Sequence, residues 1–449
     1  MIKRKMDDFL EQFFATRKEA LLVTGARQTG KTSSIRQFGK SRFECFVEIN
    51  FVERPDAVKI FRNVSGAEEL LLRLSAFAPK KLRKGSTLFF FDEVQECPEI
   101  ATAVKFLVEE GSYRYALSGS LLGVELKDIR SVPVGFLAVK EMFPLDLEEF
   151  CEALGVQESV LESLRRSFRE RVPVDPVVHE KMMKVFRLYL VVGGMPAAVA
   201  EYLASNDLGK VVAIQRSIIA LYKKDIARYD SGNKLLLEEV FGLIPPELNA
   251  QNKRFVLKDA GGNLKFSRVE NGFLWLRDAG VALPVYNVEE PRLPLLLSRS
   301  RNLFKLFQSD VGLLACQYAN GLQLKILNGE TDVNFGAVWE NAAAQELRAH
   351  GFDLYYFNSK KQGELDFVVE RDGAVLPLEI KSGKGYQRHN ALKNVLGNPR
   401  YGIKLAFVFC DGNVASEGER VYLPIYMLMF LERETGNLGV YKVDLDGLK

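Results

Sequence analysis

The segment GARQTGKT, from Gly25 to Thr32, constrains the fold of this 449-residue chain more than any other segment. It fits the pattern G-x-x-x-x-G-K-[ST], in which a glycine-rich loop leaves a buried strand and opens a helix. The apolar run EALLVT precedes the loop, as the pattern requires. Glycines allow backbone N–H groups to surround a phosphate chain, and the start of the helix adds partial positive charge. The pattern therefore predicts an α/β unit that binds a nucleotide.

The residues of this phosphate loop have separate predicted roles. Lys31 can reach the β and γ phosphates, and Thr32 can hold Mg²⁺. The remaining residues expected to contact the nucleotide are Gly25, Gln28, Thr29 and Gly30.

Two acidic residues end the apolar strand STLFFFDEV. Asp92 is placed to bind Mg²⁺, directly or through water, and Glu93 is placed to orient and polarise an attacking water. Alone, such a pair could be two exposed acids at a strand end. In the following strand, which ends in ALSGS, Ser118 or Ser120 could contact the γ-phosphate or the water, or could simply form a turn. Because Asp92 and Glu93 occur in the same chain as the phosphate loop, they predict nucleotide hydrolysis.

A second cluster of charge is expected in GELDFVVERDGAVLPLEIKSGK, which begins at Gly363. Asp372-Gly373 is typical of a two-residue hairpin turn with positive φ at both positions. That turn would place Asp366 opposite Glu379 and Glu364 opposite Lys381, all on one face. Like charges that face each other destabilise a sheet. A divalent cation between Asp366 and Glu379 would remove the repulsion, since oxygen ligands suit Mg²⁺.

Two further residues complete this predicted site. Lys381 could stabilise charge on a phosphate or help to position a water. Glu340, beside the apolar stripe of the helix predicted in NFGAVWENAAAQELRAHG, could supply another acid. The layout of an acid, then Asp, then Glu-x-Lys resembles that of the PD-(D/E)xK nucleases, in which metal-bound water attacks a phosphodiester. Alternatively, Glu364 and Lys381 form a simple ion pair on a solvated face. Lys384, Arg388 and His389 could contact phosphates or be solvated.

The chain is too long for one ordinary core, and its pattern changes along the sequence. Residues 1–150 alternate strand-like and helix-like segments around the phosphate loop. Residues 151–228 read as helices. Residues 229–325 are compatible with a winged helix, or with a packing helix whose basic residues are solvated (Lys265, Arg268 and Arg277). The helix-like and strand-like segments of residues 326–449 predict a second α/β unit.

The composition says more about the cellular compartment of the protein than about its function. The net charge of +3 neither demands nor excludes a nucleic-acid partner. Five scattered cysteines without a CxxC spacing argue against a zinc site or a disulfide framework and favour a reducing compartment. The N-terminus makes a poor signal peptide, and the longest apolar run is about half a membrane span. We therefore expect a cytoplasmic protein without a membrane partner.

The ordered motifs resemble the AAA-type ATPases that carry a DUF4143 C-terminal region. The matching segments are GARQTGKT, FFFDEVQECPE, LSGS, SVPVG, FPLDLEEF, LVVGGMPAAVAEYL, YKKDIARY, IPPELN, FKLFQSDVGLL and GELDFVV…LPLEIKSG. The resemblance implies ATP as the ligand, a helical lid, a winged-helix-like middle and a restriction-endonuclease-like C-terminal fold. One position departs from it: Phe136 follows PVG where such sequences often have arginine, so an arginine finger cannot be placed there. Arg130 is a weak substitute.

The leading hypothesis is an α/β multidomain ATPase coupled to a metal-dependent, nuclease-like domain that acts on DNA and is gated by nucleotide state. The alternative is an ATP-dependent switch that binds a protein or nucleic acid and cuts nothing. A ring-forming remodelling ATPase, and hence a homo-oligomer, would require an arginine supplied in trans.

Overall fold

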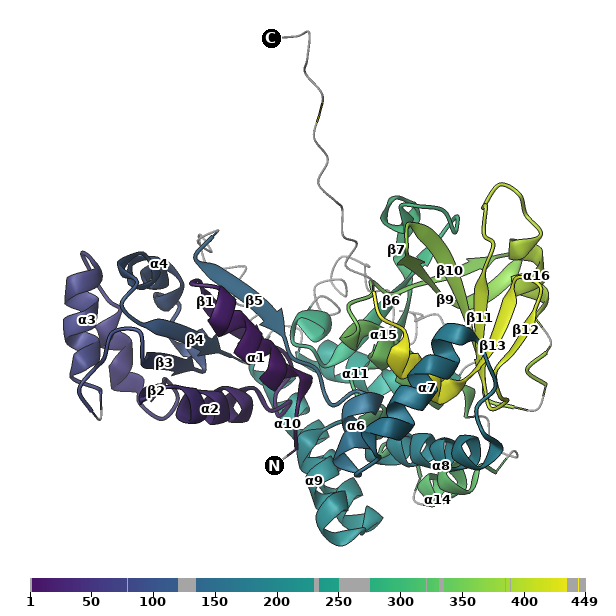
Figure 1. Ribbon diagram of the computed structural model, residues 1–449, viewed down its shortest axis with the longest axis horizontal. Coiled ribbons are helices and arrows are strands. Elements are labelled where there is room, and N and C mark those ends of the chain that lie inside the picture. The colour runs from purple at the N-terminus through teal and green to yellow at the C-terminus, as the bar shows by residue number, and fades with distance from the viewer. Residues whose placement is uncertain are drawn as a thin grey trace.

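The computed structural model describes residues 2–78, 80–119, 135–229, 234–249, 275–319, 321–330, 335–383, 385–387, 389–433 and 443. Two β-sheets lie at opposite ends of the molecule, and helices lie between and below them in the view of Figure 1. No helix among these residues is long and apolar enough to cross a membrane.

The N-terminal unit is a five-stranded parallel sheet in the order β2-β3-β4-β1-β5. Its strands are β1 (Ala20–Thr24), β2 (Cys45–Asn50), β3 (Thr87–Asp92), β4 (Arg114–Ser118) and β5 (Leu137–Glu141). Every residue of β3 is buried, as expected for a central parallel strand covered on both faces. Its helices are α1 (Lys5–Thr16), α2 (Lys31–Arg42), α3 (Ala67–Ser75) and α4 (Ile100–Glu110), with 3₁₀ turns η1 (Pro55–Ile60) and η2 (Val94–Glu96).

Along the chain, the first sheet is followed by a group of helices. It comprises α6 (Leu147–Ala153), α7 (Glu158–Glu170), α8 (Pro176–Val192), α9 (Pro196–Ser205), α10 (Leu208–Tyr229) and α11 (Lys234–Asn249). Helix α8 has clear start and stop residues. Pro176 occupies its first turn, and the side chain of Asp175 accepts hydrogen bonds from the N–H groups of residues 177 and 178. The helix ends at Gly193, whose φ is +70°.

The C-terminal unit is an eight-stranded mixed sheet in the order β12-β13-β11-β10-β9-β8-β6-β7. The strands are β6 (Ala282–Val288), β7 (Arg299–Gln308), β8 (Tyr355–Ser359), β9 (Gly363–Arg371), β10 (Ala374–Lys381), β11 (Ala406–Cys410), β12 (Ala415–Glu417) and β13 (Arg420–Pro424). Helix α15 (Gly336–Ala349) packs on β10, and α16 (Asn390–Leu396) packs on β9. Shorter elements are η4 (Leu295–Ser298), α13 (Val311–Ala315), α14 (Leu322–Asn328) and η5 (Ile425–Phe430).

This sheet begins earlier in the chain than the expected boundary at residue 326. Strand β6 pairs with β8 in parallel and with β7 in antiparallel orientation. The β6–β7 hairpin is therefore part of the larger sheet and not the separate wing of a winged helix. Much of the segment in which that winged helix was expected, including Lys265 and Arg268, lies outside the described residues.

The hairpin turn predicted at Asp372-Gly373 is confirmed. The two residues have φ values of +52° and +69°, and Arg371 pairs with Ala374. The register continues to Phe367 opposite Leu378, which brings Asp366 and Glu379 to facing positions.

One feature of β9 was not anticipated from the alternation of its residues. Along β8 the paired positions advance by two, from Tyr355 to Phe357, while along β9 they advance by three, from Val368 to Leu365. The extra residue is a β-bulge. As a result, Leu365 packs in the cluster that contains Val368, whereas Phe367, two residues further on, packs in the other cluster.

The two units meet through the last turns of α15. Arg348 forms an ion pair of 2.7 Å with Glu141 at the end of β5. Glu346 accepts a hydrogen bond of 2.9 Å from the N–H of Leu147. His350 lies 3.6 Å from Asp146, measured from Nε2 to Oδ2. Helix α15 therefore contacts both the C-terminal sheet and the segment that follows β5.

Candidate functional site

The phosphate loop connects β1 to α2, in the conformation that its glycines permit. Gly25 and Gly30 have φ values of +131° and +102°, and Gln28 is also left-handed at +65°. A Cβ atom on Gly25 would lie 2.2 Å from the carbonyl oxygen of Met142. Glycine is therefore required at position 25 both by the backbone conformation and by the close approach of a neighbouring segment.

Lys31 is buried beside its own loop. Its Nζ donates hydrogen bonds to the carbonyl oxygens of Gly25 (3.0 Å) and Ala26 (2.7 Å). Burial lowers the pKa of Lys31 to about 8, although Glu93 and Asp92 act in the opposite direction. The ammonium group thus occupies a desolvated position in which a phosphate oxygen would be a stronger partner than a neutral carbonyl.

Asp92 is the centre of a polar cluster at the carboxyl edge of the sheet. The hydroxyl of Thr32 lies 3.2 and 3.1 Å from its two carboxylate oxygens. Ser118 donates to Oδ1, and the amide of Asn50 donates to Oδ2 at 3.0 Å. Burial raises the pKa of Asp92. Sequence reasoning placed Asp92, Thr32 and Ser118 near the nucleotide but missed Asn50, whose position at the end of β2 was the available signal.

Glu93 follows Asp92 and turns away from the strand. Its backbone is left-handed, with φ at +54°, and its carboxylate accepts a hydrogen bond of 2.6 Å from the side chain of Gln95. The group is only half-buried. It is therefore accessible to a water molecule, and the amide of Gln95 helps to hold it in place.

The opposed carboxylates of the hairpin are brought together as predicted. Nζ of Lys381 lies 2.5 Å from Oε2 of Glu379 and 3.9 Å from Oδ2 of Asp366. The same Asp366 oxygen accepts a hydrogen bond of 2.8 Å from the N–H of Ile380. Burial, and then the charge of Asp366, raise the pKa of Glu379 to about 8. The chain therefore tolerates the facing acids by combining a lysine, a backbone N–H group and the burial of Glu379, which favours its protonated form.

Glu340 and Glu364 are linked by a lysine that sequence reasoning missed. Nζ of Lys305 on β7 lies 2.6 Å from Glu364 and 3.9 Å from Glu340, and it lies over the ring of Tyr356. Although burial alone would lower the pKa of Lys305, Glu340 and Glu364 raise it. Glu364 was expected opposite Lys381; because of the bulge in β9, it contacts Lys305 instead. No sequence pattern indicates that a residue from β7 reaches β9.

We call these residues the acid cluster: Glu340, Glu364, Asp366 and Glu379, with Lys305 and Lys381. Over the part of the chain that is described, no group of three or more His, Cys, Asp or Glu side chains is close enough to hold a metal ion. The lysines occupy the spaces between the carboxylates. Asp366 and Glu379 nevertheless form a pair of hard oxygen ligands of the kind that Mg²⁺ prefers.

His389, expected to contact phosphates or to be solvated, is buried. Its ring packs against Tyr422, with ring centroids 5.7 Å apart. Burial, and then the charge of Lys381, lower its pKa to about 4. The neighbouring Lys384 and Arg388 lie outside the described residues, as do Ser120 and Arg130 in the N-terminal unit.

Three family models match consecutive parts of the chain. Residues 17–151 match an AAA domain. Residues 183–324 and 335–428 match two domains of unknown function, DUF8612 and DUF4143. The chain thus begins with an AAA-type phosphate-loop domain and ends with a DUF4143 domain. Below, residues 17–151 are called the AAA domain and residues 335–428 the DUF4143 domain.

Comparison with other proteins adds little to this assignment. No curated protein matches the sequence. The Walker-type ATPase PABY2304 of Pyrococcus abyssi is 17% identical, covers 71% of this chain and 96% of its own, and superposes with a TM-score of 0.43. The Aeropyrum pernix ORC1 protein, solved in complex with DNA, is 14% identical, covers 74% of this chain and 93% of its own, and has a TM-score of 0.28. The assignment therefore rests on the family models.

Residues distant in the sequence clamp the phosphate loop of the AAA domain. The buried Arg4 donates to the carbonyl oxygens of Thr29 and Phe143, each at 2.8 Å, and to Glu149 at 3.0 Å. On another side, Arg27 forms an ion pair of 2.8 Å with Asp225 of α10. Motif analysis could not find these contacts, because they join segments that no single motif spans.

A cavity of about 780 Å³ lies beside the loop. Gly30, Ser33 and Ser34 line one side of it, and the N-terminal Arg4 lines another. The wall formed by α9 contributes apolar side chains: Pro196, Ala200, Leu203 and Ala204. The cavity has a polar side beside Gly30 and an apolar side on α9, and Lys31, Thr32 and Asp92 lie outside its lining. A cavity of this kind suits the apolar, ring-bearing part of a ligand.

Proposed function

We propose that the AAA domain binds and hydrolyses ATP with Mg²⁺. The meeting of the Thr32 hydroxyl with the Asp92 carboxylate, at 3.1–3.2 Å beside the phosphate loop, carries this proposal. The donor set fits the ion, because a hydroxyl and a carboxylate are both hard oxygen ligands. Thr32 and Asp92 would hold Mg²⁺, which would neutralise charge on the phosphates.

The residues of the chain would act in the following way. The N–H groups of residues 25–31 would surround the phosphates, and Lys31 would exchange two loop carbonyls for phosphate oxygens. Asn50 and Ser118 hold Asp92 in position. Glu93 would polarise the attacking water. The apolar wall of α9 would receive the nucleoside.

We further propose that the DUF4143 domain is a metal-dependent, nuclease-like domain with a restriction-endonuclease-like fold that acts on DNA. The facing pair Asp366 and Glu379, with Lys381 between them, supports this proposal. Asp366 and Glu379 would hold the ion once Glu379 releases its proton, and Lys381 would then be free to contact a phosphate. Glu340 lies behind Lys305 and would support the site from α15.

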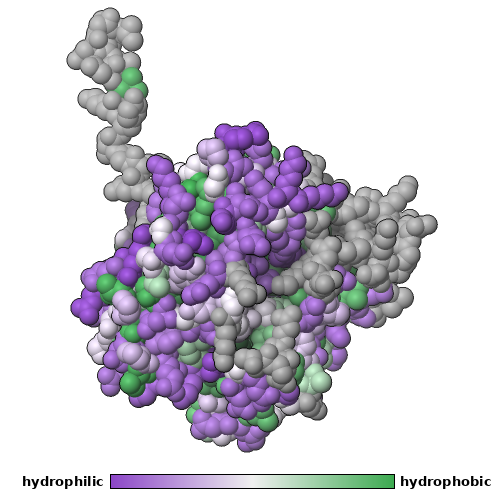
Figure 2. Space-filling model, turned by 90° about the vertical axis from the view of Figure 1, so that its right-hand side faces the viewer, coloured by the Kyte–Doolittle hydropathy of each residue, from purple (hydrophilic) through white to green (hydrophobic). Residues whose placement is uncertain are grey.

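The face of the C-terminal unit that Figure 2 shows suits a polar partner. Figure 2 shows that the visible face of this unit is mainly hydrophilic, with small and separated hydrophobic areas. An obligate protein partner would require a more continuous apolar surface than this.

Nucleotide state would gate the DUF4143 domain through α15. This helix carries Glu340 of the acid cluster and Arg348, which contacts Glu141 at the end of β5. The next residue, Met142, approaches Gly25 of the phosphate loop so closely that a Cβ atom on the glycine would collide with its carbonyl oxygen. A displacement of the loop on nucleotide binding therefore has a short path of packed groups to the acid cluster.

The test measures ATP turnover together with cleavage of linear, supercoiled and branched DNA, with Mg²⁺ or Mn²⁺ and with or without ATP. Lys31→Ala should lower ATP turnover by roughly 100- to 1,000-fold, and Asp366→Asn/Glu379→Gln should abolish cleavage while turnover continues. Glu419→Gln, an exposed acid before β13, is the matched control and should change neither activity.

The outcomes separate the proposals. ATP turnover that Lys31→Ala leaves unchanged would refute the ATPase assignment. Absence of metal-dependent cleavage under every nucleotide condition, with ATP turnover intact, would refute the nuclease assignment and favour an ATP-dependent switch that binds without cutting. Cleavage that is the same in the wild type and in the Lys31→Ala chain at every ATP concentration would refute gating.

A further inference from the structure

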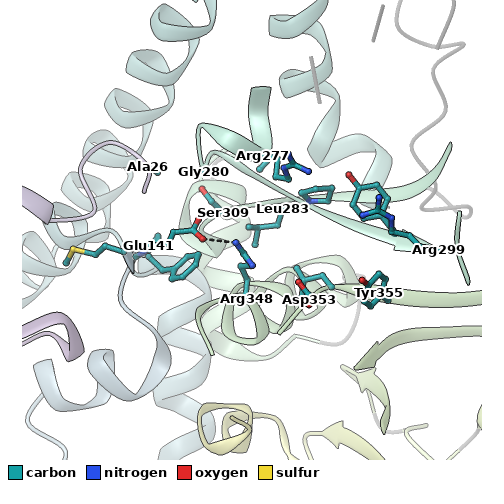
Figure 3. A pocket seen from close by; sticks show the side chains of 17 residues that line it. Ala26, Glu141, Arg277, Gly280, Leu283, Arg299, Ser309, Arg348, Asp353 and Tyr355 are labelled. Carbon is teal, nitrogen blue, oxygen red and sulfur yellow. Dashed lines mark hydrogen bonds and ion pairs between the residues drawn. The ribbon is translucent and has the colours of Figure 1, made fainter. Parts of the chain in front are cut away.

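A second cavity, of about 300 Å³, lies against the phosphate loop, but none of Lys31, Thr32, Asp92 and Glu93 and no member of the acid cluster lines it. Its walls come from the segment after β5, from the β6–β7 hairpin and from the end of α15 (Figure 3). Ala26 of the phosphate loop lies at its inner edge. The volume is at the lower end of the range of ligand pockets, which is roughly 300–1,000 Å³.

Three arginines from three different elements line this cavity. Arg277 precedes β6, Arg299 begins β7, and Arg348 lies in the last turn of α15. The side chains of Arg277 and Arg348 are 40% and 36% exposed, so both can be reached from solvent. Each also has an acidic neighbour, Asp278 and Glu141 respectively. Convergent guanidinium groups are the arrangement that proteins use to bind phosphate esters.

Two further features of the lining favour a ligand that has more than a negative charge. The guanidinium of Arg299 lies 4.7 Å from the centre of the Tyr286 ring, which forms a flat surface beside Tyr355 in the next strand. The hydroxyl of Ser309 is buried and finds no hydrogen-bond partner among the residues that the structure describes. A buried hydroxyl without a partner is costly, which marks this position as one that a ligand or water satisfies.

The cavity also touches the phosphate loop directly. Gly280 lines it, and a Cβ atom on Gly280 would lie 3.0 Å from the backbone nitrogen of Ala26. The Arg348–Glu141 ion pair spans it from the DUF4143 domain to the AAA domain (Figure 3). A ligand here would contact both domains at their junction.

We propose that this cavity binds one nucleotide unit, with its phosphate held by Arg277 and Arg299 and its base stacked on Tyr286. The unit is distinct from the ATP held by the phosphate loop. Two sources share this chemistry: a free mononucleotide and the terminal nucleotide of a single strand. Ser309 would hydrogen-bond to the bound unit, and Arg348 would link its occupancy to α15.

The experiment uses the full-length Lys31→Ala chain in EDTA, so that neither the phosphate loop nor a metal-bound acid cluster contributes. Binding of AMP, of the 5′-phosphorylated dinucleotide pdApdA and of inorganic phosphate is measured by calorimetry. We expect saturable binding of AMP or pdApdA with one site per chain. Adding Arg277→Ala/Arg299→Ala should weaken it at least tenfold, and Ser309→Ala should weaken it several-fold.

The controls separate this site from simple charge effects. Arg42→Ala/Arg62→Ala removes two exposed arginines at the far side of the AAA domain and should change affinity by less than twofold. Arg277→Lys/Arg299→Lys keeps the charge but loses the planar fork, so an intermediate loss is expected even if the alanine variant fails to fold.

The three probes decide the nature of the ligand. Tighter binding of pdApdA than of AMP assigns the cavity to the end of a strand, whereas equal or tighter binding of AMP assigns it to a free nucleotide. Equal binding of inorganic phosphate and AMP would overturn the stacking on Tyr286. Absence of saturable binding, or affinity unchanged by removal of both arginines, would overturn the proposal.

Discussion

The phosphate-loop site and the acid cluster both bring charged side chains together, but they are assembled in different ways. The loop is a continuous segment, Gly25 to Thr32, in which backbone groups provide most of the binding surface. The acid cluster takes its side chains from α15, β7, β9 and β10. The loop requires backbone conformations that only certain residues adopt, whereas the cluster requires that distant elements pack in one particular register. A site of the first kind can be read from a short motif, and a site of the second kind can be read only in part.

The largest effect on stability should come from removing the lysine of the acid cluster. Lys305→Met leaves the buried carboxylate of Glu340 without its cation, and breaking a buried ion pair costs roughly 3–5 kcal/mol. Urea unfolding would measure the change. The double variant Lys305→Met/Glu340→Met should recover much of the loss, because it replaces the pair with apolar groups. Lys184→Met, which breaks an exposed pair with Glu180, is the control and should leave the urea midpoint almost unchanged. A loss at Lys305 no larger than the control would show that the cluster is held by other contacts.

The phosphate loop should respond in activity and not in stability. Lys31→Ala removes the cation that would contact the phosphates, so ATP turnover should fall by roughly 100- to 1,000-fold, the range seen when one donor to a transition-state charge is lost. The melting temperature should change little, because Lys31 contacts only neutral carbonyl oxygens among its hydrogen-bond partners in the described structure. Lys40→Ala, at the exposed end of α2, is the matched control. An equal loss of turnover in both variants would contradict the assigned role of Lys31.

A smaller effect is expected at the hairpin turn that sets the register of the carboxylates. Gly373 has φ at +69°, and a Cβ atom there would meet nothing within 4 Å, so Gly373→Ala introduces only backbone strain of about 1 kcal/mol. Gly383→Ala, where φ is not positive and space is also open, should cost less. The midpoints of urea unfolding of the two variants measure this difference in cost. Equal costs would indicate that the turn does not depend on its left-handed residues.

The smallest effect is a pH dependence at the junction between the two regions. Burial lowers the pKa of His350, but Asp146 and Glu346 outweigh it and raise this pKa above 6.5, while burial raises the pKa of Glu346 to about 7. Both groups hold a proton more tightly in the folded chain, so stability should fall as pH rises from 6 to 8. The fall should be smaller in His350→Gln/Glu346→Gln, in which Glu379, with a pKa raised to about 8, still contributes to it. It should be retained in full in His179→Gln, because burial lowers the pKa of His179. Urea midpoints at pH 6, 7 and 8 test this, and an identical fall in the double variant would refute it.

Sequence reasoning succeeded where structure is local. The strand–loop–helix arrangement around Lys31, the convergence of Asp92 with Thr32, and the turn at Asp372-Gly373 all follow from neighbouring residues, and all are present. Each depends on backbone preferences or on the geometry of parallel strands, which act over a few residues.

It failed where packing brings distant segments together. Lys305 lies about sixty positions before Glu364 and follows no motif, so its place in the acid cluster could not be anticipated. The bulge in β9 changes the side on which Leu365 lies, although strict alternation of the sequence suggested otherwise. The same limit applies to Arg4, which clamps the phosphate loop from the beginning of the chain.

The pairing of β6 with β8 has a practical consequence for anyone who divides this protein into parts. The DUF4143 match begins at residue 335, but two strands of its sheet lie before that point. A fragment cut at residue 335 would lack β6 and β7, leaving the backbone groups of β8 without partners along one edge. Such an open edge invites pairing with other chains, and the fragment would also lack Lys305 beside the buried Glu340. Insolubility of that fragment would therefore be a consequence of the position of the cut. A fragment that is meant to contain the whole C-terminal unit must include the β6–β7 hairpin, which begins at Ala282.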